Sequence, residues 1–223
     1  MLLAVDTSTA QVGLAIYDGS QVIGEYAWRS TLGARHTVEL APAIFELLGR
    51  CGLKMEDVRA LGVALGPGSF TSLRVGLSLV KGLALSRQLP LIGIPTLDIL
   101  AAAQASSKLP LVVAIQAGRG RFAAGWYKRT KSGWRAKGSA RVLTIEALIN
   151  ELSGPVILCG EFTAKERQVL AGNPEIQLAS PAQAVRRPAV LAELAWARWQ
   201  TGDVDDEATL APIYLHVAEP VPA

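Results

Sequence analysis

The first half of the chain alternates short apolar runs with longer segments in which apolar residues recur every three or four positions. The short runs predict β-strands, and the longer segments predict helices with one buried face. The expected strands cover about residues 2–5, 12–17, 22–28, 60–65 and 91–94. The expected helices cover about 37–50 and 72–87, and a third begins at Thr96. Pro42 predicts either a kink in the first helix or its true start.

The same order of elements begins again after the polar stretch at 105–108. A shift of 110 residues places 112–116 on 2–6 and 124–127 on 14–17, although only Ala4/Ala114 and Tyr17/Tyr127 are identical. Later elements are expected as strands near 133–143 and 156–159, helices opened by Thr144 and Thr163, and a last helix over about 188–200. The pattern predicts a duplicated α/β unit with domains at 1–108 and 109–223, the second of which carries the last helix and the tail.

Composition is that of a folded chain with a sizeable core, since 50% of the 223 residues are hydrophobic. The apolar runs are shorter than the roughly 18 residues of a membrane span. Cys51 and Cys159 lie far apart and fit no metal-ligand spacing. We therefore expect a cytoplasmic protein that has reduced thiols and no contact with a membrane.

One segment concentrates positive charge although the formal net charge of the chain is only +3. Between residues 119 and 141 there is no Asp or Glu, and the basic residues are Arg119, Arg121, Lys128, Arg129, Lys131, Arg135, Lys137 and Arg141. This segment is either a surface that faces a polyanion, such as transfer RNA, or a solvated strand face, which is the commoner outcome.

Residues 66–76, Gly-Pro-Gly-Ser-Phe-Thr-Ser-Leu-Arg-Val-Gly, form an elbow between a strand and a long helix. The two glycines at its start permit a sharp turn, and a hydroxyl at Ser69 or Thr71 can cap the helix. The free N–H groups of such an elbow can bind a phosphate, and Asp6 after the first strand is a candidate for cofactor binding. The candidate nucleotide or phosphate residues are Asp6, Thr7, Ser8, Gly66, Gly68 and Ser69. The plainer alternatives are a simple connector at the elbow and a turn residue at Asp6.

These motifs resemble the bacterial TsaB (YeaZ) family. The resemblance is carried by Asp6-Thr7-Ser8-Thr9, by His36 before a helix ending Phe45-Glu46-Leu47-Leu48, by the elbow, and by Lys81-Gly82-Leu83-Ala84. It is dense over about 2–105 and thin beyond. It implies an α/β fold of two actin/Hsp70-like, ribonuclease H-like halves, each a mixed sheet flanked by helices.

The resemblance also implies a function. Family members are accessory, non-catalytic subunits required for threonylcarbamoyl transfer to the adenosine next to the transfer RNA anticodon, and they bind and activate a catalytic paralogue. The implied partners are that TsaD-like paralogue, a TsaE-like ATPase and, through the complex, transfer RNA. A homodimer through the same helices is expected when the chain is alone. No cofactor is implied beyond weak or interface-bound ATP or ADP.

The helix after the elbow is apolar on most of its faces, which fits either a helix buried in a core or one that docks on a partner. The resemblance favours docking. The candidate partner interface is His36, Leu40, Ile44, Leu47, Arg74, Val75, Gly76, Leu79 and Leu83. For Arg74, a surface cap of the polar strip is an equal alternative to an interface or anion contact.

The chain departs from the family at Ser72, where Gly is usual, and at Gln116, where Asp is usual. The catalytic paralogue carries an H-x-x-x-H metal motif, whereas His36 is followed four positions later by Leu40. We therefore expect no metal site and no catalytic residue, and we assign His36 to a helix cap. The alternative function is an ATP-dependent small-molecule kinase of the same fold, in which Asp6 and the elbow hold phosphates.

Overall fold

The computed structural model describes residues 1–30 and 36–215, without the side chains of His36 and Thr37. It divides into two compact units. The first comprises Met1–Ile99 and Arg186–Ile213, and the second is centred on Leu100–Val185. This division differs from the expected one in two ways: the first break falls after Ile99 instead of at 108/109, and the chain returns to the first unit at Arg186 to place its last helix there.

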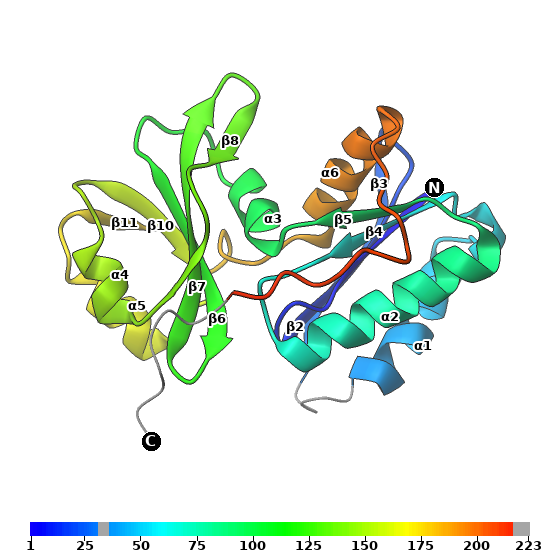
Figure 1. Cartoon of the computed structure of the whole chain (residues 1–223), viewed down its shortest axis with the longest axis horizontal. Coiled ribbons are helices and arrows are strands. Elements are labelled where there is room, and N and C mark those ends of the chain that lie inside the picture. The colour runs from blue at the N-terminus through cyan, green and yellow to red at the C-terminus, as the bar shows by residue number, and fades with distance from the viewer. Residues whose placement is uncertain (31–35, 216–223) are drawn as a thin grey trace. The chain divides into compact units, whose positions relative to one another are not determined.

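The first unit is a five-stranded mixed sheet in the order β3-β2-β1-β4-β5 (Figure 1). Its strands are β1 (Leu2–Asp6), β2 (Gln11–Tyr17), β3 (Val22–Arg29), β4 (Ala60–Ala64) and β5 (Leu91–Ile94). β1 pairs antiparallel with β2 and parallel with β4. A central strand of such a sheet is buried on both faces, which explains why β1 is apolar up to Asp6, its last residue.

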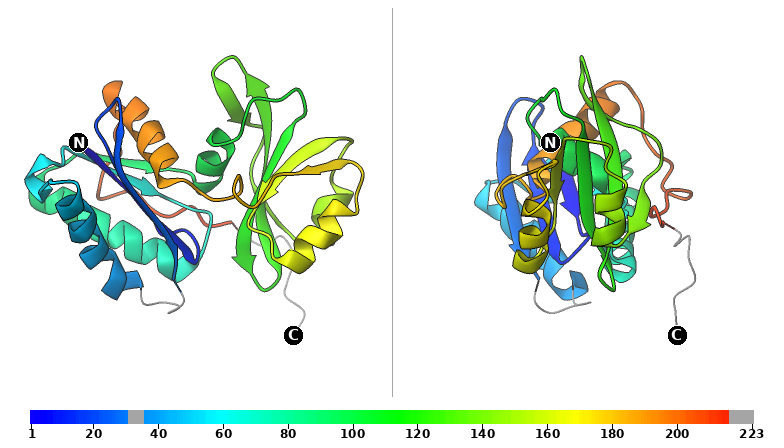
Figure 2. Two further views of the ribbon diagram at one scale, coloured as in Figure 1. Left: turned by 180° about the vertical axis from the view of Figure 1, so that it is seen from behind. Right: turned by 90° about the vertical axis from the view of Figure 1, so that its left-hand side faces the viewer.

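Helices cover both faces of this sheet (Figure 2). On one side α1 (His36–Arg50) and α2 (Phe70–Arg87) pack over Leu3 and Val5 of β1. On the other side α6 (Pro188–Gln200) packs over Leu2 and Ala4. The alternation of side chains along a strand therefore divides the core into two layers. The unit also contains a 3₁₀ turn (Met55–Asp57) and the start of α3 (Thr96–Ala102).

Pro42 lies inside α1, so the prediction that it marks the start of this helix is wrong. Its side chain lies on the exposed side of the helix. The described residues after α6 continue along the same unit: the N–H of Gly93 donates to Asp205 Oδ2 at 2.8 Å, and the N–H of Ile213 donates to Leu65 O at 2.7 Å. This segment is thus an ordered cover as far as Ile213.

The second unit repeats the topology of the first, with its main strands in the order β11-β10-β6-β7-β8. The strands are β6 (Leu111–Gly118), β7 (Arg121–Thr130), β8 (Gly133–Ala136), β9 (Arg141–Leu143), β10 (Val156–Gly160) and β11 (Ile176–Leu178). β6 pairs antiparallel with β7 and parallel with β10, as β1 does with β2 and β4. The predicted fold class, two duplicated halves with a mixed sheet in each, is confirmed.

Details of the second unit differ from the sequence pattern. The strand expected near 133–143 is two short strands, β8 and β9, which pair with different parts of β7. In the first unit Leu3 pairs with Ile16, so a shift of 110 residues would pair Val113 with Trp126. In the structure Val113 pairs with Gly125 instead, one residue earlier on β7. An irregularity between Gln116 and Gly118 lies near the β6–β7 turn. The helices α4 (Ile145–Asn150) and α5 (Ala164–Ala171) begin, as predicted, at Thr144 and Thr163 caps.

None of the described helices combines the length and the apolar composition needed to cross a lipid bilayer.

Candidate functional site

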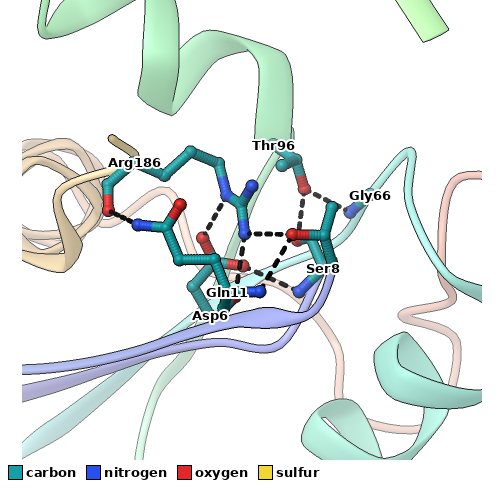
Figure 3. A network of polar contacts seen from close by, with 7 residues as sticks. Asp6, Ser8, Gln11, Gly66, Thr96 and Arg186 are labelled. Atoms are coloured by element: carbon teal, nitrogen blue, oxygen red, sulfur yellow. Dashed lines mark hydrogen bonds and ion pairs between the residues drawn. The ribbon is translucent and has the colours of Figure 1, made fainter. Parts of the chain in front are cut away.

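Asp6, at the end of β1, lies in a buried polar network of the first unit (Figure 3). The Nε of Arg186 donates to Asp6 Oδ2 at 2.7 Å, and the N–H of Ser8 donates to Asp6 Oδ1 at 2.8 Å. The Nη2 of Arg186 also donates to Thr9 Oγ1 at 3.0 Å and to Gln11 O at 2.9 Å. Each oxygen of the carboxylate therefore has a partner within the unit, and a buried cation balances its charge.

A second branch of the network connects the turn after β1 to the elbow before α2. The hydroxyls of Ser8 and Thr96 lie 2.6 Å apart, and the N–H of Gly66 donates to Thr96 Oγ1 at 2.9 Å. The N–H of Ser69 donates to Ser8 O at 2.7 Å. Backbone N–H groups that could contact a phosphate are thus engaged inside the protein at Gly66 and Ser69.

The small residues of the elbow permit close packing on this turn. A Cβ at Gly68 would meet the carbonyl group of Ser8, and a Cβ at Gly76 would meet the side chain of Thr7. Thr7 in turn donates its hydroxyl to Ser72 O at 2.8 Å. Ser69 occupies the N-cap position of α2, but its side chain accepts no capping N–H and instead contacts the Ser72 hydroxyl at 3.1 Å. The elbow is therefore built for contact between backbone segments.

The structure brings the six candidate phosphate residues together in one place. These residues are Asp6, Thr7, Ser8, Gly66, Gly68 and Ser69. Sequence reasoning missed Arg186 as the partner of Asp6 and the role of Thr96 as a bridge. The only local signal was that a buried aspartate needs a cation, and that signal does not say which one. The described residues contain no group of three or more His, Cys, Asp or Glu side chains placed to hold a metal ion.

The second candidate site lies on α1 and α2. Leu40, Ile44 and Leu47 are buried in the core of the first unit, and their part in a partner interface stays a prediction. They fall on the stripe of α1 that faces the sheet, since residues three and four apart share one face of a helix. Gly76 is also buried, against Thr7.

The other predicted interface residues have different positions. Arg74 is exposed, while Val75, Leu79 and Leu83 are half-buried. The side chain of His36 lies outside the described part of the chain, so its role as a cap stays a prediction.

Large apolar side chains that the sequence reasoning did not select are exposed on these two helices. Val38 and Phe45 of α1 are 70% and 62% exposed, and Phe70 and Leu85 of α2 are 53% and 69% exposed. The guanidinium of Arg74 lies 3.8 Å from the centroid of the Phe70 ring, a cation–π contact. We call the surface formed by Val38, Phe45, Phe70, Arg74 and Leu85 the α1–α2 face. The sequence pattern that could have identified the α1–α2 face is the presence of apolar residues outside the stripe of each helix that faces the core.

A groove of about 570 Å³ lies at Phe70 and Arg74 of this face. Its lining is mainly apolar and consists of Leu40, Phe70, Thr71, Arg74, Val75, Ser78 and Leu79. The predicted residues Leu40, Arg74, Val75 and Leu79 therefore line a surface depression, next to the exposed side chain of Phe70. Aromatic residues and arginine are the types that contribute most to protein interfaces.

Gln116, where the resemblance implied Asp, lies in the second unit. Its Nε2 donates to Glu161 O at 3.2 Å and to Glu166 Oε2 at 3.4 Å. Glu166 also caps the start of α5. The amide thus takes part in a hydrogen-bond network that a carboxylate, which cannot donate, would not form.

Comparisons with known proteins agree with this architecture. The family model described as "TsaD: tRNA N6-adenosine threonylcarbamoyltransferase" matches residues 30–178. The tRNA threonylcarbamoyladenosine biosynthesis protein TsaB of Bacillus subtilis (strain 168) is 30% identical over 224 residues, which cover 98% of this chain and 95% of that protein. The protein of the same name from Escherichia coli (strain K12) is 30% identical over 71% of this chain and 70% of its own length.

Among solved structures, YeaZ from Pseudomonas aeruginosa has a TM-score of 0.77 and 26% identity, with 96% of this chain and 99% of that chain covered. The similarity extends over both units, well beyond the elbow that carries the most distinctive motif. Since a relative that is 30% identical matches nearly end to end, this chain belongs to the TsaB (YeaZ) family.

Proposed function

We propose that this chain is a non-catalytic subunit in the biosynthesis of threonylcarbamoyladenosine in transfer RNA. In this role it binds and activates a catalytic TsaD-like paralogue, which transfers the threonylcarbamoyl group to the adenosine next to the anticodon. The names of its relatives and the match to the transferase family model support the pathway and the kind of partner. The observation that carries the proposal is the α1–α2 face.

The α1–α2 face has the features of a protein interface. Four large apolar side chains stand mostly in solvent on two helices that pack against each other. Burying one such side chain completely is worth about 1.5–3 kcal/mol, so four of them can drive association. Phe45 and Phe70 supply aromatic anchors, and Arg74 adds a cation that a partner carboxylate could meet.

The mechanism would be conformational support of the partner. A protein that binds the active conformation of an enzyme more tightly than the inactive one shifts the enzyme toward activity, by the difference in binding free energy. Such a subunit needs no acid, base or metal of its own. The proposal includes no cofactor in this chain; ATP or ADP, if bound, would lie at the interface with the paralogue.

The remaining assignments follow from the same role. A TsaE-like ATPase would join the complex, transfer RNA would be reached through it, and all components would meet in the cytoplasm. In the absence of the paralogue, a second copy of this chain would cover the α1–α2 face and form a homodimer.

The alternative, an ATP-dependent kinase of the same fold, gains no support at Asp6. A carboxylate that organises Mg²⁺ uses oxygens that can reach the ion. Here Oδ2 accepts from Arg186 and Oδ1 accepts from the N–H of Ser8. The elbow N–H groups of Gly66 and Ser69 also have partners inside the unit.

The test is size-exclusion chromatography with light scattering, on the chain alone and mixed with its TsaD-like paralogue. Phe45→Glu should abolish the heterocomplex, because it places a charge in an apolar contact. The matched control is Val169→Glu on α5, since Val169 is also an exposed apolar helix residue, at 49% exposure. Both variants should keep the wild-type circular dichroism and melting temperature.

Two outcomes would contradict the proposal. One is a Phe45→Glu variant that still binds the paralogue and restores threonylcarbamoyl transfer in a mixture of purified components. The other is Mg²⁺-dependent turnover of ATP by the purified chain alone, which would favour the kinase.

A further inference from the structure

The positive charge of this protein is concentrated in one strand-rich segment of the second unit. The segment 119–141 carries eight basic and no acidic residues, whereas the whole chain has 22 basic and 19 acidic ones. The rest of the chain therefore has 14 basic residues against 19 acidic ones, an excess of negative charge. The net charge of +3 thus depends entirely on this segment.

The fold gathers half of these cations on one face of the β7–β8 ribbon. Lys128 of β7 lies directly opposite Arg135 of β8. The N–H of Lys137 donates to Trp126 O at 2.6 Å, which places Lys137 opposite Trp126. Since alternate residues of a strand share a face, Trp126 and Lys128 lie on the same side as Arg135 and Lys137.

Arg141, at the start of β9, completes this surface. Its guanidinium lies 4.4 Å from the centroid of a Trp126 ring. We call the surface formed by Trp126, Lys128, Arg135, Lys137 and Arg141 the basic ribbon. Its four cations are all exposed, and its one aromatic side chain is half-buried.

Acidic side chains do little to balance the basic ribbon. Arg141 forms an ion pair with Glu151. Within the described part of the chain, Lys128, Arg135 and Lys137 form none. Two like charges directly opposite each other on a ribbon destabilise it, so the pair Lys128 and Arg135 is unfavourable unless an anion lies nearby.

We propose that the basic ribbon binds the phosphodiester backbone of a structured RNA. Three neighbouring cations without acidic partners, Lys128, Arg135 and Lys137, fit a polyanion, and the stack of Arg141 on Trp126 offers a planar surface to an unstacked base. Naming that RNA as transfer RNA rests on the proposed function. The proposal then gives the accessory subunit a direct contact with the substrate of the reaction, in addition to its contact with the paralogue.

The test measures binding of a fluorescently labelled, unmodified transfer RNA to the full chain by anisotropy, between 50 and 200 mM salt. If three or four phosphates are neutralised, affinity should fall by about 20- to 150-fold over this fourfold change in salt. Lys128→Glu/Arg135→Glu/Lys137→Glu should lower the affinity at least tenfold at 50 mM salt and flatten the salt dependence.

The matched control is Arg119→Glu/Arg121→Glu/Arg129→Glu. It changes the net charge by the same amount within the same segment. Arg129 lies opposite Trp134, on the other face of the ribbon; Arg121 begins β7 at its far end, and Arg119 lies in the turn between β6 and β7. If the ribbon face is the binding surface, the control should retain most of the affinity.

Several results would overturn the proposal. They are equal losses in the two triple variants, binding of the wild type that does not respond to salt, and competition by duplex DNA or by anionic lipid vesicles as strong as that by transfer RNA. If these charges only protect the edge strand β8 from aggregation, the ribbon variant would lose solubility but keep its RNA affinity.

The same variants separate this proposal from the function proposed above. The ribbon variant should still form the heterocomplex with the TsaD-like paralogue in size-exclusion chromatography, because the α1–α2 face is unchanged. Loss of RNA binding with an intact complex supports the ribbon alone. An intact RNA contact without a heterocomplex in the wild type would contradict the accessory role and leave the ribbon supported.

Discussion

Arg186 and Asp6 are 180 positions apart in the sequence and form a buried ion pair, with 2.7 Å between Arg186 Nε and Asp6 Oδ2. Asp6 ends the first strand, and Arg186 immediately precedes the segment that enters α6. The pair therefore connects the beginning of the chain to the segment that returns to the first unit. The guanidinium of Arg186 also occupies one oxygen of the Asp6 carboxylate, which a kinase would need to be accessible to Mg²⁺.

Asp6→Asn should destabilise the protein strongly. The substitution leaves the guanidinium of Arg186 buried without its counter-charge, and breaking a buried pair in this way costs about 3–5 kcal/mol. Urea denaturation followed by circular dichroism measures the change in the free energy of unfolding. The double variant Asp6→Leu/Arg186→Met, which removes both charges, should recover a substantial part of the loss. A single variant as stable as the wild type would show that the pair contributes little.

Gly76→Ala should destabilise the protein, whereas Gly82→Ala on the same helix should stabilise it. A Cβ at position 76 would meet Thr7, while a Cβ at position 82 has no atom within 4 Å. Overpacking costs about 1–3 kcal/mol, and replacing an exposed helical Gly by Ala gains about 0.8–1 kcal/mol. Melting temperatures and urea midpoints of the two variants decide the matter. Equal stabilisation by both would mean that α2 does not pack on the turn after β1 as described.

Glu25→Gln should reduce stability in a pH-dependent manner. Burial alone raises the pKa of Glu25, but the hydrogen bonds from Arg187 and the N–H of Ala189, together with the charge of Arg187, lower it below its ordinary 4.5. A folded-state pKa below the unfolded one stabilises the protein above the unfolded pKa, and this gain disappears as the pH falls through the folded pKa. The ion pair is partly exposed, so the expected difference at pH 7 is about 1 kcal/mol.

The measurement for Glu25 is the urea midpoint of the wild type and of Glu25→Gln between pH 7 and pH 3. The difference between the two urea midpoints should be largest near neutral pH and should disappear in acid. A gap that stays constant over this range would exclude the ionised pair as its cause.

Cys159 should be an unreactive thiol in the folded protein. Burial raises its pKa from 9.0 to about 12, against a smaller opposing effect of Arg167. The fraction of reactive thiolate at pH 8 is then about a thousandfold lower than in the unfolded chain. In a Cys51→Ser background, where Cys159 is the remaining thiol, iodoacetamide should react slowly with native protein and rapidly in urea. Fast labelling of the native protein would contradict the buried position.

The raised pKa of Cys159 also makes the stability of the protein depend on pH in the alkaline range. Because the folded pKa lies above the unfolded one, the unfolded chain loses its proton first as the pH rises. Stability should therefore be unaffected below about pH 9 and fall between pH 9 and pH 12. Cys159→Ser should lack this contribution.

The sequence predicted many helices and strands well, because caps, turn residues and apolar spacing lie within the element itself. α6 covers Pro188–Gln200, as its apolar spacing and its initial proline indicated. The caps at Thr144 and Thr163 were readable from a hydroxyl before an apolar helix pattern. β11, with only three residues, gave too short a pattern to detect.

The α1–α2 face shows where such reading fails. Apolar residues on α1 and α2 indicated that both helices bury surface, but the pattern does not tell which residues face the sheet and which face outward. Leu40 and Ile44 turned out to serve the core, while Phe45 and Leu85 are the exposed ones. In a helix that is apolar on several sides, either of two sets of residues could face the core. Only the position of the sheet shows which set does.

The sequence by itself determined the order of strands and helices, the duplication, the elbow and the concentration of positive charge, because periodicity, turn residues and composition act over short stretches of chain. Only the tertiary structure decided that Arg186 neutralises Asp6, that α6 completes the first unit, and that Lys128, Arg135 and Lys137 share a face with Trp126. Those relationships join residues that are distant in sequence or that depend on strand register. They are fixed by the free energy of packing the whole chain, which no local pattern contains.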